Sequence, residues 1–119
     1  MFVCSVTFGA RSALKRDFDA GLIPLKRDIT GKPLKHGYVS LDHTIPKSKG
    51  GKSELYNYSL MDIVINNKRS SNPIKNYIDL ESLVEYIIIM LDVNTPDVYG
   101  IDYLRGWLRT LQKALKENK

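Results

Sequence analysis

The chain has 119 residues and a net charge of +5. This length predicts a single domain over residues 1–119 with a modest hydrophobic core, and the basic balance favours a polyanionic partner without requiring one. The single cysteine, Cys4, excludes an intrachain disulfide and a zinc site built on cysteine pairs. The longest apolar run is far below the roughly 20 residues that a membrane span needs, and the N-terminus lacks the pattern of a signal peptide. We therefore expect a cytoplasmic protein that has no membrane partner.

The N-terminal third of the chain predicts two short elements followed by a loop. Residues 1–8 alternate loosely between apolar and polar types, which favours a strand. Residues 10–20 have helical composition, and Gly21 follows where the C-terminus of a helix favours a left-handed residue. Prolines and a glycine punctuate residues 22–33, so we expect a loop there.

The middle of the chain predicts two strands and a helix. The apolar positions in residues 38–41 favour a strand, residues 46–53 form a polar loop, and residues 58–61 favour a second strand. Asp62 is a typical N-cap residue, and it predicts a helix that contains residues 66–69.

Asp79 predicts the start of a longer helix at residues 80–92. The aliphatic residues of this helix recur at spacings of three and four, which predicts a stripe that faces the core. The residues of this stripe are Leu80, Leu83, Val84, Ile87, Ile88 and Leu91. Two further aliphatic residues broaden it, so we expect the helix either to be deeply buried or to contact a partner.

Thr95 and Pro96 predict the start of the last helix. Its apolar seam predicts either packing on the domain or dimerisation through the seam. The seam consists of Ile101, Leu104, Leu108, Leu111 and Leu115. Basic residues near one face of the same helix could contact DNA, although a solvated face is the simpler interpretation. These basic residues are Arg105, Arg109, Lys113 and Lys116.

Residues 41–69 contain the side chains that metal-assisted cleavage of a phosphodiester requires. A hard divalent cation prefers oxygen ligands, which Asp42 and Asn66 supply if the helix brings Asn66 beneath the end of the first strand. His43 could take a proton from an attacking water if its ring is neutral. Asn67 is the alternative to Asn66 as a ligand, one helical step of about 100° away.

The loop between the two predicted strands suits a phosphate contact. Asn57 carries both donors and an acceptor, so its amide could bridge backbone groups across the loop. The glycine pair at positions 50–51 allows close backbone approach. Three lysines place positive charge where a phosphate backbone could pass, namely Lys47, Lys49 and Lys52. Taken one at a time, each of these features also has an ordinary explanation as a turn or a solvated loop.

The order and spacing of these residues resemble the HNH endonucleases, which belong to the His-Me finger (ββα-metal) group. The matching residues are Asp42, His43, Pro46, Ser48, Gly50, Gly51, Asn57, Asn66 and Arg69. They fall within residues 35–72, about a third of the chain, and the loop string DHTIPKSKGG is especially close to the usual form of the family.

The resemblance implies an α+β fold with a small ββα-metal core, a flanking N-terminal segment and two C-terminal helices over about residues 79–118. Many relatives hold this core with a structural zinc bound by Cys-x-x-Cys pairs. Asp62 and Ile65 occupy the corresponding later positions here, so we expect no structural zinc. The surrounding core, chiefly the C-terminal helices, must then hold the motif in place.

The resemblance also implies a role for each motif residue. Asp42 and Asn66 are expected to bind one divalent cation, Mg²⁺ in the first place, with Mn²⁺, Ni²⁺ or Zn²⁺ as substitutes. His43 is the expected general base, and Asn57 is expected to orient this base and to brace the loop. The expected nucleic-acid contacts are Lys47, Lys49, Lys52, Lys68 and Arg69.

The implied function is hydrolysis of DNA phosphodiester bonds, with double-stranded DNA as the partner and a phage or mobile element as the setting. One such site cuts one strand, so double-strand cleavage would need two copies, from a homodimer or with the help of a partner protein. The alternative is a catalytically silent HNH-like protein that binds nucleic acid or a protein partner.

Overall fold

The computed structural model describes residues 13–116, which form an α+β fold. Its helices and strands are a helical segment at residues 13–19, β1 (Val39–His43), β2 (Tyr58–Asp62), α2 (Ile63–Arg69), α3 (Leu80–Leu91) and α4 (Gly100–Leu115). Short 3-10 turns are η1 (Lys47–Lys49), η2 (Leu55–Asn57) and η3 (Ile74–Asn76). The helix and the Gly21 cap predicted near the N-terminus are confirmed over the described residues, and the strand predicted at residues 1–8 lies outside them.

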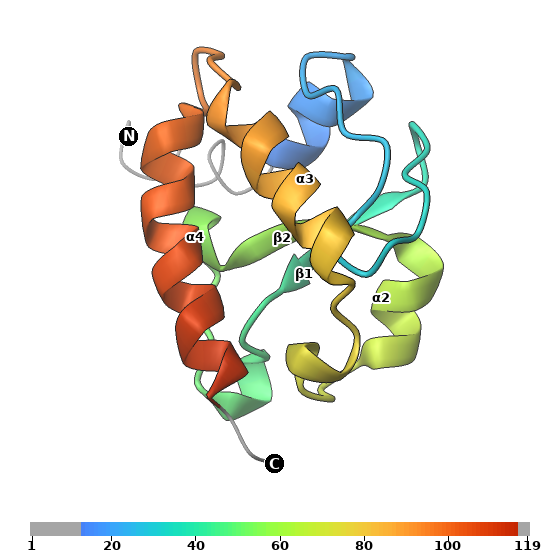
Figure 1. The fold of residues 1–119 in the computed structure, drawn as a ribbon, viewed down its shortest axis with the longest axis vertical. Helices are drawn as coiled ribbons and strands as arrows, with labels where there is room; N and C mark the ends of the chain where they lie inside the picture. The colour runs from blue at the N-terminus through green and yellow to red at the C-terminus, as the bar shows by residue number, and fades with distance from the viewer. Residues whose placement is uncertain (1–12, 117–119) are drawn as a thin grey trace, which may run out of the picture.

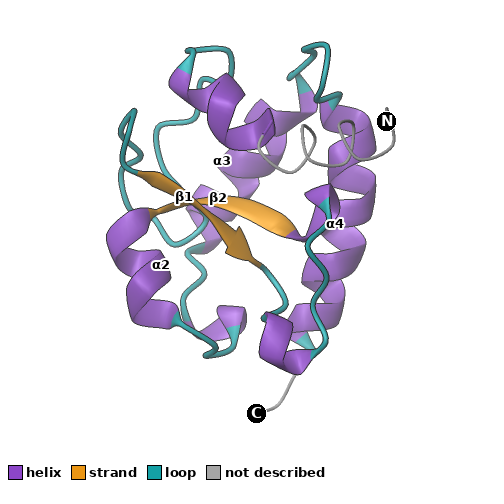
Figure 2. Ribbon diagram, turned by 180° about the vertical axis from the view of Figure 1, so that it is seen from behind, coloured by secondary structure: helices purple, strands orange, loops and turns teal. Residues whose placement is uncertain are grey.

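The two strands form an antiparallel hairpin that leads directly into α2. In the register, Leu41 pairs with Leu60 and Asp42 pairs with Ser59. The Asp62 side chain accepts hydrogen bonds from the backbone of Val64 and Ile65 and so caps α2. Both predicted strands and the predicted cap are therefore confirmed. Figure 2 shows the hairpin between α2 on one side and α4 on the other.

The outer edge of β2 is buried, yet within residues 13–116 no third strand pairs with it. Three side chains from distant parts of the chain satisfy its backbone groups instead. These contacts are Tyr103 Oη donating to the Tyr58 carbonyl (2.6 Å), Leu60 N–H donating to Tyr86 Oη (3.2 Å), and Asp62 N–H donating to Asp28 Oδ2 (2.9 Å). Because buried backbone groups must find partners, these side chains replace the missing strand.

The two tyrosines form a continuous hydrogen-bonded relay along this edge. Tyr86 Oη lies 2.8 Å from Tyr103 Oη. Since Tyr103 donates its proton to the β2 carbonyl, Tyr86 must donate to Tyr103. Burial raises the pKa of Tyr86 to about 12 and that of Tyr103 well above its usual value, so both hydroxyls stay protonated. Trp107 stacks on both rings and donates from Nε1 to Ser59 Oγ (2.9 Å).

The core stripe predicted for α3 is confirmed only in part: Leu83 and Ile87 are partly buried and pack against the core. The helix and its Asp79 cap are confirmed. Four of the predicted core residues are 49–73% exposed, and these are Leu80, Val84, Ile88 and Leu91. The buried face instead carries Ser82, Tyr86 and Met90. The helix turns this face inward because the Tyr86 hydroxyl is needed at the edge of β2, a tertiary requirement that a count of aliphatic residues cannot reveal.

The predicted start of the last helix is also wrong, because α4 begins at Gly100. Thr95 closes a turn instead of capping a helix: its hydroxyl accepts from Val98 N–H (3.1 Å) and donates to Asp17 Oδ2 (2.5 Å). A Cβ on Gly100 would lie 1.8 Å from the Met90 carbonyl oxygen. The helix can therefore start beside the end of α3 only at a glycine.

The apolar seam predicted on α4 is partly confirmed. Leu104 and Leu111 are buried, but Ile101, Leu108 and Leu115 are 39–56% exposed. Among residues 13–116, no helix is long and apolar enough to cross a membrane.

Replacing Tyr103 with Phe should lower the free energy of unfolding by about 1–3 kcal/mol, because the buried Tyr58 carbonyl and the Tyr86 hydroxyl both lose a partner. Urea denaturation measures this loss. Tyr99→Phe is the matched control, since that ring is 52% exposed, and it should change stability very little. Equal effects of the two substitutions would contradict the relay.

Candidate functional site

Arg69, at the end of α2, is completely buried and ties that helix to the end of β1. Its guanidinium donates to the Asn72 carbonyl (2.9 Å), the His43 carbonyl (3.1 Å), the Thr44 carbonyl (2.9 Å) and the carboxylate of Asp42. A phosphate cannot reach a guanidinium in this position. The expected nucleic-acid contact by Arg69 is therefore wrong, and the side chain is an internal clamp.

Asp42 is the partner of this clamp and is itself only 3% exposed. Burial raises the pKa of its carboxyl to about 6, and the Arg69 guanidinium opposes that rise. The group is therefore mainly ionised at neutral pH. An ion pair buried in this way is costly to break on one side only, because the remaining charge then has no partner.

His43, the last residue of β1, is half-buried next to Asp42. Its Nε2 atom lies 3.1 Å from Ser53 Oγ, and its ring meets the edge of the Tyr58 ring at 4.9 Å between centroids. The loop and β2 therefore both contribute to the orientation of the imidazole.

Asn57 braces the loop as the sequence predicts. Its Oδ1 accepts from Ile45 N–H (2.9 Å), and its Nδ2 donates to the carbonyls of Ile45 (3.1 Å) and Lys52 (2.8 Å). The side chain is buried, and its own carbonyl accepts from Thr44 N–H (2.8 Å). Four hydrogen bonds at one residue thus hold the start and the end of the loop together.

Close packing, both within the loop and against α4, also holds the loop in place. A Cβ on Gly51 would lie 1.7 Å from the Ile45 carbonyl oxygen, so only glycine fits at this position. A Cβ on Gly106 of α4 would lie 2.7 Å from the Cβ of Tyr56. The last helix therefore packs directly against the loop segment that carries Asn57.

Asn66 reaches the same region from α2. Its Nδ2 donates to Ser40 Oγ at 2.5 Å, which leaves its Oδ1 as the atom with which it could bind a cation. Alternation along β1 puts Ser40 and Asp42 on the same face of the strand, so this bond brings Asn66 toward Asp42. Asn67 is exposed on α2. Of the two asparagines, Asn66 is therefore the one that the structure brings toward Asp42.

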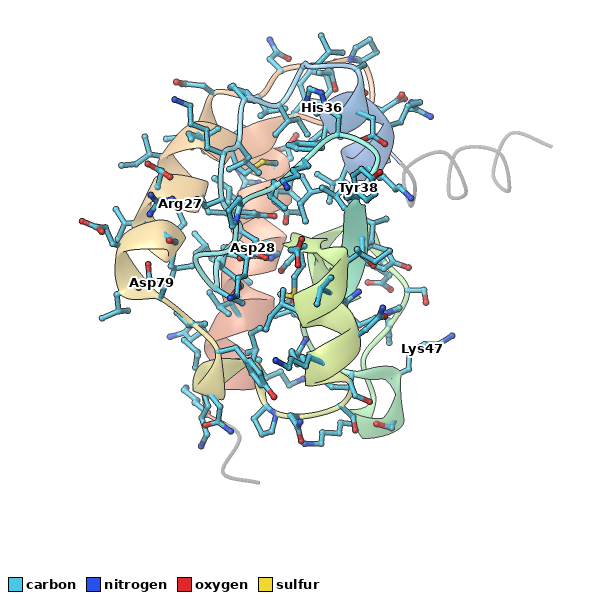
Figure 3. The ribbon with its side chains drawn as sticks, turned by 90° about the vertical axis from the view of Figure 1, so that its right-hand side faces the viewer. Arg27, Asp28, His36, Tyr38, Lys47 and Asp79 are labelled. Carbon is cyan, nitrogen blue, oxygen red and sulfur yellow. The ribbon has the colours of Figure 1, made fainter. Side chains whose placement is uncertain are left out.

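An open cleft of about 320 Å³ collects these side chains. It is lined by Leu41, Asp42, His43, Pro46, Lys47, Ser48, Asn66, Ser70 and Ser71. Of the predicted phosphate contacts, Lys47 is on the wall of this cleft, and Figure 3 shows it projecting from the side of the molecule opposite Asp79. Lys49, Lys52 and Lys68 are exposed but do not line the cleft. His36 is exposed and packs its ring edge-on against Phe18.

The donor atoms at the cleft fit a hard divalent cation. Arg69 holds Oδ2 of Asp42, and the other carboxylate oxygen is the one that remains for a metal. Together with Oδ1 of Asn66 it would give two oxygen ligands from one wall of the cleft, with room for water and a phosphate on the other positions. Ser40, which positions Asn66, was not predicted as a site residue. The sequence could have indicated it, because a residue two positions before Asp42 on a strand lies on the same face as Asp42.

Comparisons with protein-family models, with curated proteins and with solved structures find no match to this chain.

Replacing Arg69 with Met should lower the free energy of unfolding by about 3–5 kcal/mol, because the Asp42 carboxylate is then buried without its partner. The double variant Arg69→Met/Asp42→Leu should recover much of that loss, since it removes both charges. Urea denaturation of the two single variants and the double variant measures the coupling. Additive effects, or a stable Arg69→Met variant that only binds DNA more weakly, would contradict the clamp.

Proposed function

We propose that this protein is a metal-dependent endonuclease of the HNH type that hydrolyses DNA phosphodiester bonds. One observation carries the proposal: Asp42 and His43 at the end of β1 and Asn66 on α2 line a single cleft. The order of β1, β2 and α2 along the chain agrees with the ββα-metal core that the sequence motif implies. The basic composition of the chain is consistent with a phosphate backbone as the substrate.

In the proposed reaction, His43 in its neutral form takes a proton from the water that attacks phosphorus, and the 3′ oxygen leaves. Ser53 orients the imidazole, and Asn57 keeps the loop that carries Ser53 in place. Asp42 and Asn66 would hold one divalent cation, whose charge would stabilise the phosphate and the departing oxygen. Lys47, on the cleft wall, contributes a positive charge beside the phosphate path.

A specific observation favours the alternative, a catalytically silent HNH-like protein that binds nucleic acid or a protein partner. The Asp42 carboxylate is almost completely buried, and one of its oxygens is held by Arg69. A carboxylate engaged in this way has less freedom to bind a metal. We favour the enzyme because Asp42, His43 and Asn66 nevertheless share the cleft.

Plasmid nicking tests the proposal. Purified wild type, His43→Ala and His36→Ala would be assayed with Mg²⁺, Mn²⁺ or Ni²⁺, and with EDTA. His36→Ala is the matched control because His36 is the other histidine of the chain and lies outside the cleft. We expect nicking by wild type and His36→Ala, and a loss of about 100-fold or more in His43→Ala, the size typical of a missing general base.

Equal activity of wild type and His43→Ala would reject His43 as the base. A folded wild type that binds DNA but does not nick it in the presence of any of these metals would instead favour the silent alternative.

A further inference from the structure

The outer faces of α3 and α4 expose an unusual number of large aliphatic side chains. These are Leu80, Val84, Ile88 and Leu91 on α3, and Ile101, Leu108 and Leu115 on α4, each between 39% and 73% exposed. Figure 1 shows α3 in front of the strands and α4 beside them, with the two helices running in roughly opposite directions. Monomeric proteins rarely leave an apolar surface of this extent in water. We therefore expect another molecule to bind this face.

The charges beside this apolar face differ in sign between the two helices. The exposed acidic residues on α3 and at its C-cap are Glu81, Glu85 and Asp92. The exposed basic residues on α4 and at its C-cap are Arg105, Arg109, Lys113 and Lys116. On a helical projection of 100° per residue, each set lies next to the exposed aliphatic residues of its own helix and away from its buried face. The face is thus acidic along one border and mainly basic along the other, where Asp102 in the first turn of α4 is the one acidic residue among four basic ones.

We propose that a second copy of this chain covers this face. A surface with an apolar centre, one acidic border and one basic border is complementary to itself after rotation about a two-fold axis parallel to the helices. That rotation places α3 of each subunit over α4 of the other. The acidic border of one subunit then meets the basic border of its partner, and the result is a four-helix arrangement with apolar side chains inside.

The charge pattern also selects this axis over its main competitor. A two-fold axis perpendicular to the helices in the same plane would place α3 on α3 and α4 on α4. Acidic residues would then face acidic residues, and basic residues would face basic residues, which is unfavourable. The pattern therefore specifies an orientation as well as a partner.

The relative heights of the two helices identify the facing charges. Gly100 lies level with Met90, since a Cβ at Gly100 would touch the Met90 carbonyl. With equal rise per residue on antiparallel helices, Arg105 is level with Glu85, and Arg109 is level with Glu81. Rotation about an axis parallel to the helices preserves these heights. Glu85 therefore faces the partner subunit's Arg105, and Glu81 faces the partner subunit's Arg109.

The dimer surface and the cleft are separate. Figure 3 shows Asp79, at the start of α3, on the side of the molecule opposite Lys47 of the cleft. The dimer therefore does not depend on the proposed nuclease activity, and the two clefts would face away from each other.

Sedimentation velocity over a range of concentrations tests the proposal on the full chain. Wild type should sediment at twice the monomer mass of 13.6 kDa. Arg105→Glu and Glu85→Arg should each raise the dissociation constant by about tenfold or more, because each change places two like-charged pairs in the interface. The double variant Glu85→Arg/Arg105→Glu should restore the wild-type constant to within about threefold, because it re-creates both pairs with reversed sign.

Lys35→Glu is the matched charge-reversal control, because Lys35 is exposed beside Tyr38, which Figure 3 shows away from α3. It should leave the dissociation constant unchanged. A monomeric wild type at every concentration would overturn the proposal, as would a dimer that is insensitive to both single variants. A double variant no better than the singles would overturn the proposed orientation. Circular dichroism establishes that each variant is folded.

Discussion

The buried contact between Arg69 and Asp42 is the interaction on which the candidate site depends. One guanidinium joins the last turn of α2 to the side chain and backbone at the end of β1. Removing two charges from water is expensive, and the cost is recovered only when good hydrogen bonds surround the pair. Here four donor contacts meet that condition. The consequence is that Asn66, on the same helix, is held close to the strand that carries Asp42 and His43.

The rest of the domain supports this arrangement from behind. A hairpin of two strands is too small to be stable alone, and its buried outer edge is completed by hydroxyls from α3 and α4 and by Asp28. The α4 helix also packs against the loop through Gly106 and Tyr56. The expectation that the C-terminal helices hold the motif in place agrees with these contacts. Side-chain hydrogen bonds and packing thus fix the geometry of the cleft.

Local signals in the sequence were sufficient for the elements around the cleft and insufficient for the contacts between them. The caps at Asp62 and Asp79 could be predicted because capping involves only the next three residues. The Asn57 brace could be predicted because it spans a single loop. Arg69 could not be assigned correctly, because an arginine at this spacing suits a phosphate as well as a buried carboxylate. The inward face of α3 depends on Tyr86 reaching β2, a contact across 26 positions of the chain.

The central claim is that Asp42 and Asn66 bind one divalent cation in the cleft, and electron paramagnetic resonance of Mn²⁺ tests it without reference to cleavage. Wild type should bind one Mn²⁺ per chain. Asn66→Ala should weaken that binding by about tenfold or more, whereas Asn67→Ala, on the neighbouring exposed position, should leave it unchanged. A folded wild type that binds no Mn²⁺, or an Asn66→Ala variant that binds it as tightly as wild type, would contradict the account.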